Sequence, residues 1–392
     1  MAHVKRIFAC ILGLLLSLGA EAQTYRYATS FSLSARDFCD TIPIEVVDDY
    51  IIVGIRMQGR TLRAMIDTGS AQGMVYSNRM PPAWTELGNV ISHDANNHAD
   101  TVKVVQLPPF RLGSETISGY VATVMGPTST ATKWDLVIGF DLFNKGLCGK
   151  IDTENRRMIL TDRRKLFDAE AGHTLRYKLK WFVPHVMVSP FVRHTDEVLF
   201  DTGATMLYEM NKMSFDEHAY KSHNVESQVE ERAHGSAAIA GHSVEEEAEV
   251  VLLHMERLEW NGFEMRDVRA LTTQGSSRIG SALLRYGTVT INPFKKRLTL
   301  QPYCQCDSVY VGNKMFGTAF IPVNGLPAVG LVFTSSDAYR QGLRQGDIIQ
   351  RIDGVVMRTF QDFVRFPFVK GRRHVFTVVG KDGQQREVEV ER

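Results

Sequence analysis

The sequence has 392 residues, which corresponds to two or three domains at about 150 residues per domain. Its 44% hydrophobic and 23% charged residues argue against wholesale disorder, collagen-like repeats and a protein with several membrane spans. The 45 Lys and Arg residues nearly balance the 44 Asp and Glu residues, so the chain lacks the basic excess of a dedicated nucleic-acid binder.

The N-terminus has the pattern of a secretory signal peptide. Lys5 and Arg6 precede the apolar run Ile7–Leu16, and small residues up to Ala22 form a cleavage site. The run is too short to span a bilayer, and no later segment has the ~18 consecutive apolar residues of a transmembrane helix. Cys10 lies near the start of the run, which is the wrong place for a lipid-attachment cysteine. We therefore expect an exported protein, periplasmic or extracellular, with no lipid or transmembrane anchor.

Short apolar runs dominate the chain up to Pro302. Their lengths and their Val, Ile, Thr and Phe content are typical of β-strands. Gly-containing breaks at Met57–Gly59, Gly113, Asn261–Gly262 and Gly287 fit hairpin turns between them. The predicted strands include 50–53, 64–66, 102–107, 121–125, 186–188, 198–200, 250–253 and 289–291. The sequence thus predicts a mainly β fold for this region.

The strongest organisational feature is an internal repeat. An apolar strand ends in Asp-Thr-Gly at residues 67–69, and a second one does so at residues 201–203. Downstream, each copy has an apolar-Gly step, ending at Gly139 and at Gly280, that leads into a short helix. Each copy then finishes with a strand, a polar turn and a strand: 149–160 and 287–300. This repetition predicts two homologous lobes of similar size.

These motifs resemble the aspartic proteases of the pepsin-like and retropepsin-like group, in which each lobe contributes one Asp-Thr-Gly. The resemblance covers roughly residues 45–302 and implies a first lobe at 23–165 and a second at 166–302. A single Asp-Thr-Gly is weak evidence, because Asp and Gly are turn formers and ordinary residue usage gives one in about a tenth of chains this long. Two copies in register, each with its apolar-Gly step, are far more specific.

Peptide hydrolysis by water needs a base that activates the water and an acid that stabilises the oxyanion or protonates the leaving nitrogen. Two carboxyls within hydrogen-bond reach cannot both ionise cheaply, so identical residues can supply both groups. The resemblance therefore implies that Asp67 and Asp201 are the catalytic residues, share one proton and clamp the attacking water. A different class stays open as an alternative, a non-catalytic peptide-binding or sensor protein that uses this cleft and a groove in the C-terminal unit.

Six neighbouring residues are expected to support this pair: Thr68, Gly69, Ser70, Thr202, Gly203 and Ala204. In the family, the threonines tie the two loops together through hydroxyl–backbone hydrogen bonds. The glycines permit close backbone approach to the carboxylates. Ser70 could donate a further hydrogen bond to Asp67, whereas Ala204 has no hydroxyl to do so for Asp201.

Aspartic proteases also cover the cleft with a β-hairpin flap. The matching segments are about Ile91–Val104, with a polar tip at His93–His98, and about Arg232–Val250. Neither segment contains a tyrosine, so the flap tyrosine of pepsin-like enzymes has no match here. The acidic run Glu245–Glu249 is expected to be a solvated strand edge.

Four cysteines remain after removal of the signal peptide, and an even number in an oxidising compartment favours disulfides. The Cys304-Gln305-Cys306 spacing lacks the two-residue gap of zinc sites, so we expect neither a metal nor a cofactor. The family's interlobe sheet, where the N-terminal and C-terminal segments meet, implies that Cys39 pairs with Cys304 or Cys306 and that Cys148 takes the remaining partner. A Cys304–Cys306 bridge would close a strained, tight loop and is not expected.

A third unit, residues 308–392, resembles a PDZ domain. The stretch 336–354 matches the family pattern of Ala, Gly-Leu, Gly-Asp and Ile-Asp-Gly. The resemblance implies a groove helix at 359–366 and a closing hairpin formed by 375–379 and 387–390. By position, the loop that would bind a peptide's terminal carboxylate comprises Phe316, Gly317, Thr318, Ala319 and Phe320.

The sequence thus predicts a mainly β, two-lobed aspartic endopeptidase followed by an α+β PDZ domain and exported by a signal peptide at residues 1–22. Its expected partners are polypeptide substrates and C-terminal peptides held in the PDZ groove. Since no acid–base pair in a recognisable motif lies after Pro302, we expect the PDZ domain to be separable from the chemistry. A serine hydrolase is disfavoured because the chain lacks a Gly-X-Ser-X-Gly motif.

Overall fold

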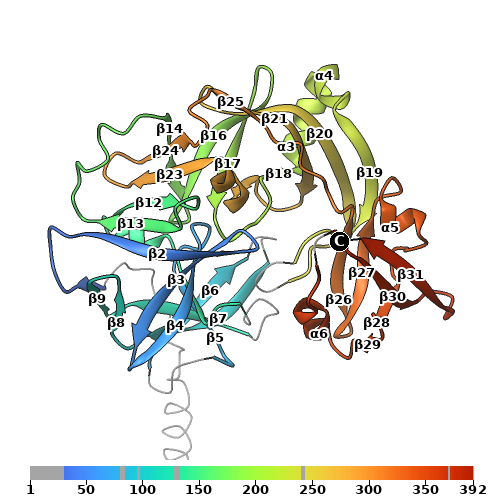
Figure 1. Ribbon diagram of the computed structural model, residues 1–392, viewed down its shortest axis with the longest axis horizontal. Helices are drawn as coiled ribbons and strands as arrows, with labels where there is room; N and C mark the ends of the chain where they lie inside the picture. Colours follow the sequence, from blue (N-terminus) through green and yellow to red (C-terminus); the bar gives the residue numbers. More distant parts are fainter. Residues whose placement is uncertain are drawn as a thin grey trace, which may run out of the picture.

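The computed structural model describes residues 31–79, 84–94, 98–126, 133–239, 243–369 and 371–391. Most of these residues lie in β-strands, which confirms the mainly β class (Figure 1). The predicted signal peptide, with Cys10, lies outside the described residues. In the part of the chain that the structure describes, no helix combines the length and the apolar character needed to cross a membrane.

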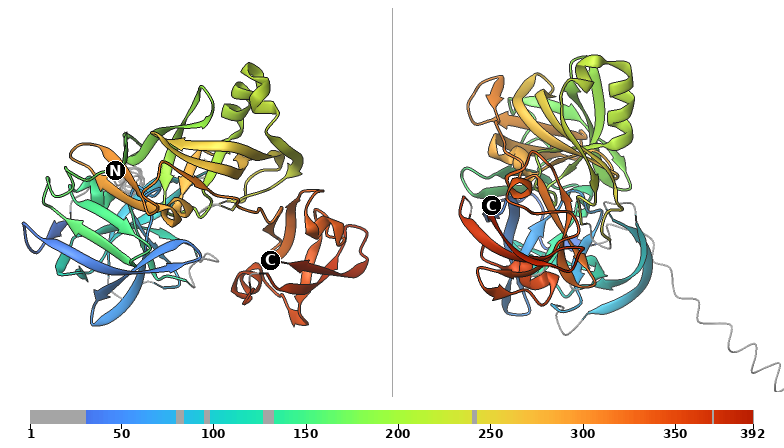
Figure 2. Two further views of the ribbon diagram at one scale, coloured as in Figure 1. Left: turned by 45° about the horizontal axis from the view of Figure 1, so that its top comes forward. Right: turned by 90° about the vertical axis from the view of Figure 1, so that its right-hand side faces the viewer.

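The strands form a 16-stranded, a 9-stranded and a 6-stranded sheet. One apolar core runs through the two larger sheets, from Phe31 to Leu300. The smallest sheet, which we call the C-terminal module (residues 318–391), has a core of its own, from Val329 to Val390. Figures 1 and 2 show this module, in red, to one side of the two larger sheets.

The N-terminal repeat (residues 32–161) is organised around the first Asp-Thr-Gly. β4 (Arg60–Ile66) pairs in parallel with β11 (Leu136–Ile138), and β5 (Gly73–Tyr76) lies antiparallel to β11 and parallel to β10 (Val121–Met125). The predicted turn at Gln58-Gly59 is present, and both of its residues have a positive φ. The other elements are β1 (Ser32–Leu33), β2 (Cys39–Val47), β3 (Tyr50–Met57), β6 (Thr85–His93), β7 (Ala99–Gln106), β8 (Phe110–Leu112), β9 (Glu115–Ser118), α2 (Asp141–Asn144), β12 (Cys148–Asp152) and β13 (Arg157–Thr161).

The central repeat (residues 173–302) reproduces this pairing. β17 (His194–Asp201) pairs in parallel with β22 (Arg278–Gly280), and β18 (Tyr208–Asn211) lies antiparallel to β22 and parallel to β21 (Phe263–Thr273). The predicted short helix after each apolar-Gly step is α2 in the first copy and the 3-10 helix η2 (Ser281–Arg285) in the second. The other elements are β14 (His173–Arg176), β15 (Lys178–Lys180), β16 (Val183–Phe191), α3 (Lys212–Lys221), α4 (His223–Glu226), β19 (Val229–Gly235), β20 (Ala248–Trp260), β23 (Gly287–Asn292) and β24 (Arg297–Pro302).

Six strands join the two repeats side by side, in the order β14, β24, β23, β12, β13 and β2. The junction is the antiparallel pair β12–β23, in which Gly149 faces Ile291. Gly287 belongs to this sheet, where it begins β23 opposite Pro302, so the prediction that it forms a hairpin turn was wrong. A Cβ at Gly287 would lie 2.5 Å from the carbonyl oxygen of Gln301, so the glycine serves close strand approach.

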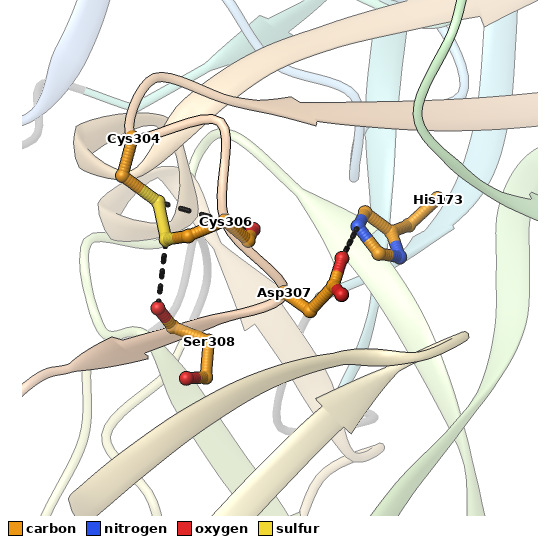
Figure 3. Close-up of a disulfide and its surroundings, with 5 residues drawn as sticks. All are labelled: His173, Cys304, Cys306, Asp307 and Ser308. Carbon is orange, nitrogen blue, oxygen red and sulfur yellow. Dashed lines mark hydrogen bonds and ion pairs between the residues drawn. A yellow bond between two sulfur atoms is a disulfide. The ribbon is translucent and has the colours of Figure 1, made fainter.

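The strand order also corrects the predicted disulfides. Cys39 begins β2, which is separated from β24 by β13, β12 and β23, or about 19 Å at about 4.8 Å per strand step. Cys39 and Cys148 both neighbour Thr161, which places them two strand steps apart, beyond the about 7 Å limit for a bridge. Cys304 and Cys306 instead form a disulfide with Cα atoms 5.2 Å apart, against the Ser308 carbonyl (Figure 3). Cys39 and Cys148 are free thiols, so the predicted pairing was wrong.

The C-terminal module is a sheet with the order β26 (Thr318–Val323), β27 (Leu326–Val332), β28 (Ile348–Ile352), β30 (Arg373–Val379) and β31 (Gln385–Glu391). β29 (Val355–Val356) pairs with β28, and α5 (Asp337–Arg340) follows β27. The predicted helix at 359–366 is α6 (Phe360–Arg365), which begins with a capping box between Thr359 and Asp362. β26 has a neighbour on one side in this sheet and forms its edge.

Candidate active site

The two Asp-Thr-Gly segments come together from the two repeats. Asp67 directly follows β4, and Asp201 is the last residue of β17. In each repeat, this strand pairs in parallel with the strand of the apolar-Gly step, so each aspartate leaves the sheet beside Gly139 or Gly280. Asp67 is 9% exposed and Asp201 is 7% exposed. The fold thus places two carboxyl groups in one largely buried site.

The apolar-Gly steps hold the two loops in matching positions. The amide of Phe140 donates to the carbonyl of Ser70 at 2.7 Å, and the amide of Ser281 donates to the carbonyl of Ala204 at 2.8 Å. A Cβ at Gly139 would lie 2.5 Å from a carbonyl oxygen of the first loop, and one at Gly280 would lie 2.2 Å from a carbonyl oxygen of the second. Glycine is therefore required at both steps because the loop backbone packs directly on them.

Thr68 and Thr202 bind the two loops to each other reciprocally. The hydroxyl of Thr68 donates to the carbonyl of Phe200, and the hydroxyl of Thr202 donates to the carbonyl of Ile66, both at 2.7 Å. Each hydroxyl also accepts a hydrogen bond from the backbone amide of the opposite threonine, at 3.0 Å. Both side chains are fully buried, so these four bonds are shielded from water.

Each Asp-Thr-Gly glycine lies against the aspartate of the other repeat. A Cβ added to Gly69 would lie 2.4 Å from the carboxyl group of Asp201, and one added to Gly203 would lie 2.6 Å from the carboxyl group of Asp67. Real Cβ atoms do not approach other atoms this closely. The missing side chains therefore let the two carboxyl groups approach each other across the junction of the repeats.

The two carboxyl groups are electrostatically coupled and unequal. Burial, then the charge of Asp201 and a hydrogen bond with its side chain, raise the pKa of Asp67 well above its usual value. Oδ1 of Asp67 accepts from the amides of Gly69 and Ser70, at 2.9 and 3.1 Å, while Oδ1 of Asp201 accepts from the amide of Gly203 at 2.9 Å. The Ser70 hydroxyl does not supply the predicted bond to Asp67, because it donates to the carbonyl of Gln72 within its own loop.

An aromatic cluster near the aspartates was not predicted from the sequence. Burial, then the charges of Asp201 and Asp67, raise the pKa of Tyr50 to about 12. The ring of Tyr50 lies 4.8 Å from that of Trp134, whose indole N–H donates to the hydroxyl of Tyr76 at 3.1 Å. These residues come from β3, from β5 and from the segment before β11, so only the order of these elements around β4 in the sheet could have indicated them.

Asp141 is a buried carboxyl group next to the first loop and the apolar-Gly step. It is 3% exposed, and its carboxylate accepts hydrogen bonds from the Tyr120 hydroxyl at 2.8 Å and from the Leu142 amide at 3.0 Å. The Tyr120 hydroxyl in turn accepts from the amide of Gly139 at 3.2 Å. Burial, which outweighs these bonds, raises the pKa of Asp141 to about 7. The backbone of Gly73, the first residue of β5, also hydrogen-bonds to this carboxyl group, which therefore links the apolar-Gly step to the strand that follows the first Asp-Thr-Gly.

Two hairpins occupy the positions predicted for flaps. β6 pairs with β7 in the first repeat, and β19 pairs with β20 in the second. Their ends meet, since the hydroxyl of Ser243 donates to Asp94 at 2.8 Å, while residues 95–97 and 240–242 lie outside the described residues. Glu245 is 3% exposed and accepts from Thr273 and Gln274, so the prediction that this part of the acidic run is solvated was wrong.

The predicted carboxylate-binding loop precedes and begins β26. Gly317 has a φ of 69°, and its carbonyl accepts from the amide of Phe333 at 2.8 Å. The ring of Phe320 packs against that of Phe316 at 6.1 Å and against that of Phe363 on α6 at 4.7 Å. Thr318, Ala319 and Phe320 are the first three residues of the edge strand β26, and Phe316 and Gly317 lead into it.

Comparison with protein-family models gives no match to this chain, and a search of curated proteins gives none. Among the described residues, no group of three or more His, Cys, Asp and Glu side chains is arranged to hold a metal ion.

Proposed function

We propose that the chain is an exported, two-lobed aspartic endopeptidase whose N-terminal and central repeats are the lobes. The observation that carries this proposal is the reciprocal arrangement of the two Asp-Thr-Gly segments, in which threonine bonds and missing Cβ atoms bring Asp67 and Asp201 together. A pair of buried carboxyl groups that share one proton contains a general base and a general acid at the same time.

In this mechanism the two carboxyl groups share one proton, because burial and the charge of Asp201 raise the pKa of Asp67 and so oppose ionisation of both groups at once. The ionised carboxylate of the pair accepts a proton from water as the water oxygen attacks the peptide carbonyl carbon. The protonated carboxyl group gives its proton to the carbonyl oxygen, so that no full negative charge develops there. The intermediate then breaks its C–N bond as the carboxyl group that took the water proton gives it to the leaving nitrogen, while the other carboxylate accepts a proton from one hydroxyl of the intermediate, which leaves the pair singly protonated for the next cycle.

We further propose that the C-terminal module is a PDZ domain that binds peptide C-termini. The edge strand β26 has hydrogen-bonding groups available for an added peptide strand, and the loop that ends in Phe320 lies at one end of it. Peptides captured there would have a raised local concentration near the cleft.

Incubation of the mature protein with a mixed peptide library tests the catalytic proposal. Wild type should cleave, whereas Asp67→Asn and Asp201→Asn should each lose cleavage and keep their fold, because water activation needs both groups. Asp307→Asn is the matched control, since this side chain is 93% exposed. Full activity in either of the first two variants would contradict the dyad. A wild-type protein that binds hydroxyl-containing peptide mimics and cleaves nothing would favour the peptide-binding alternative.

A further inference from the structure

The hairpin β19–β20 is bound to the C-terminal module by a cluster of hydrogen bonds. The carboxylate of Glu231 accepts from the amide and the hydroxyl of Thr334, both at 2.6 Å, and from the amide of Ser335 at 3.0 Å and its hydroxyl. Partial burial opposes ionisation, but the bonds from Ser335 and Thr334 lower the pKa of Glu231. The amide of Ser236 also donates to the carbonyl of Gly330 at 3.1 Å, where β19 meets β27 (Figure 1).

An apolar cluster closes the same interface. Val250 and Leu252 of β20 are 2% and 4% exposed, and Leu331 and Phe333 of the module are each 1% exposed. Partly buried side chains from both partners surround these four: Ala233, Ala237, Leu271, Met315 and Ala319. Such burial contributes more to holding two elements together than exposed polar contacts do.

The segment that connects the central repeat to the module is itself part of the repeat's sheet. β25 (Ser308–Tyr310) pairs in parallel with β21, the strand beside β20. Asn313 then exchanges hydrogen bonds with the backbone of Arg269, at 2.7 and 2.8 Å. The module is therefore held to the central repeat in two ways: the connecting segment is hydrogen-bonded to β21, and the module itself packs on hairpin β19–β20.

The equivalent hairpin β6–β7 lacks this degree of burial. β6 and β19 are each the last strand on one side of their sheets. No residue of β6 is buried, whereas the end of β19 is covered by the module at Gly235, where a Cβ would lie 2.3 Å from the Gly330 carbonyl oxygen. β7 pairs with β6 along its whole length but with β10 only at its inner end, from Val104 to Gln106. Strands with few buried apolar side chains and exposed backbone bonds open at a lower free energy than packed ones.

We propose that the C-terminal module fixes hairpin β19–β20 as a rigid wall of the cleft, so that hairpin β6–β7 alone opens to admit a polypeptide. Opening then breaks the Ser243–Asp94 contact and leaves the Glu231 contacts intact. This inference rests on the proposed function for the identity of the polypeptide, but the difference between the two hairpins does not depend on cleavage.

Hydrogen exchange of the full chain, read by mass spectrometry, tests the proposal. In wild type, the amides of β6 should exchange at least about tenfold faster than those of β19. Glu231→Ala should raise exchange in β19 about tenfold and leave β6–β7 unchanged. Glu256→Ala, an exposed glutamate on β20, is the matched control and should change neither hairpin. Thr334→Val with Ser335→Ala removes donors from the opposite side of the interface and should act as Glu231→Ala does.

A statine-containing peptide, added as a hydroxyl-bearing probe, separates the two proposals. If it binds, it should slow exchange in β6–β7 and leave β19–β20 unaffected, and equal slowing of both hairpins would overturn the rigid-wall assignment. If it does not bind, the protease proposal is contradicted, but hydrogen exchange of the two hairpins in the free protein still tests whether the module holds β19–β20 rigid. Equal exchange of β6 and β19 in wild type would overturn the rigid-wall proposal.

Discussion

Asp141 is a buried carboxyl group whose effect on stability has a definite dependence on pH. Burial, which outweighs the bonds from Tyr120 and Leu142, raises its pKa from 3.8 to about 7. A carboxyl pKa that is raised in the folded state stabilises the fold fully below the unfolded-state pKa, and this stability is lost as the pH rises through the folded-state pKa. At about 1.4 kcal/mol per pKa unit, the loss between about pH 4 and about pH 8 amounts to about 4 kcal/mol.

The variant Asp141→Asn stays neutral at every pH, so it should not show this loss. Its free energy of unfolding relative to wild type should therefore rise by about 4 kcal/mol between about pH 4 and about pH 8. Urea unfolding followed by tryptophan fluorescence measures this quantity for the two repeats, because all 4 tryptophans lie before the C-terminal module. Asp67 titrates in both proteins, so its contribution cancels in the difference. Parallel stability curves for the two proteins would refute the burial argument.

Three further predictions concern the loops and the thiols. Thr202→Val should lower the free energy of unfolding by about 2–4 kcal/mol, because it leaves a buried carbonyl and a buried amide without partners. Thr288→Val is the control and should cost little in urea unfolding, since the buried Thr288 hydroxyl has no hydrogen-bond partner among the described residues. Gly203→Ala should abolish peptide cleavage, because its methyl group would enter the opposite carboxyl group; an active, correctly folded variant would contradict this. Iodoacetamide should modify the exposed Cys39 in the native protein and spare the buried Cys148 until urea is added, and mass spectrometry of the labelled peptides distinguishes the two.

The features of this fold that the sequence predicts well are local ones. Short apolar runs bounded by glycine-containing turns identify β3, β4 and β10, because strand formation depends on residues that are close in the sequence. The repeated apolar-Gly step can also be recognised in the sequence. Gly139 and Gly280 must be glycine because a Cβ at either position would collide with a carbonyl oxygen of the adjacent loop. A sequence repeat of this kind therefore predicts the equal strand pairings found around the two Asp-Thr-Gly segments.

The features that could not be predicted depend on which strands become neighbours. The order of the sheet that joins the repeats separates Cys39 from β24, and this order cannot be deduced from cysteine spacing. Glu245 reads as a surface residue of an acidic run, yet Thr273 and Gln274 lie close enough to bind its carboxylate in the interior. Tyr50 approaches the aspartates only because β3 lies beside β4. Each of these outcomes is decided by long-range packing rather than by the local pattern.

Because of the reciprocal bonds of Thr68 and Thr202, the site forms only when the two halves of the chain pair. In either half alone, the loop would lack hydrogen-bond partners, since each threonine hydroxyl bonds to backbone groups of the other half. Two repeats supplied as separate polypeptides would regain the site only on pairing, and its population would then fall on dilution by mass action. In a single chain the two repeats are covalently connected, so their pairing is intramolecular and does not depend on protein concentration; the site stays formed however dilute the protein becomes.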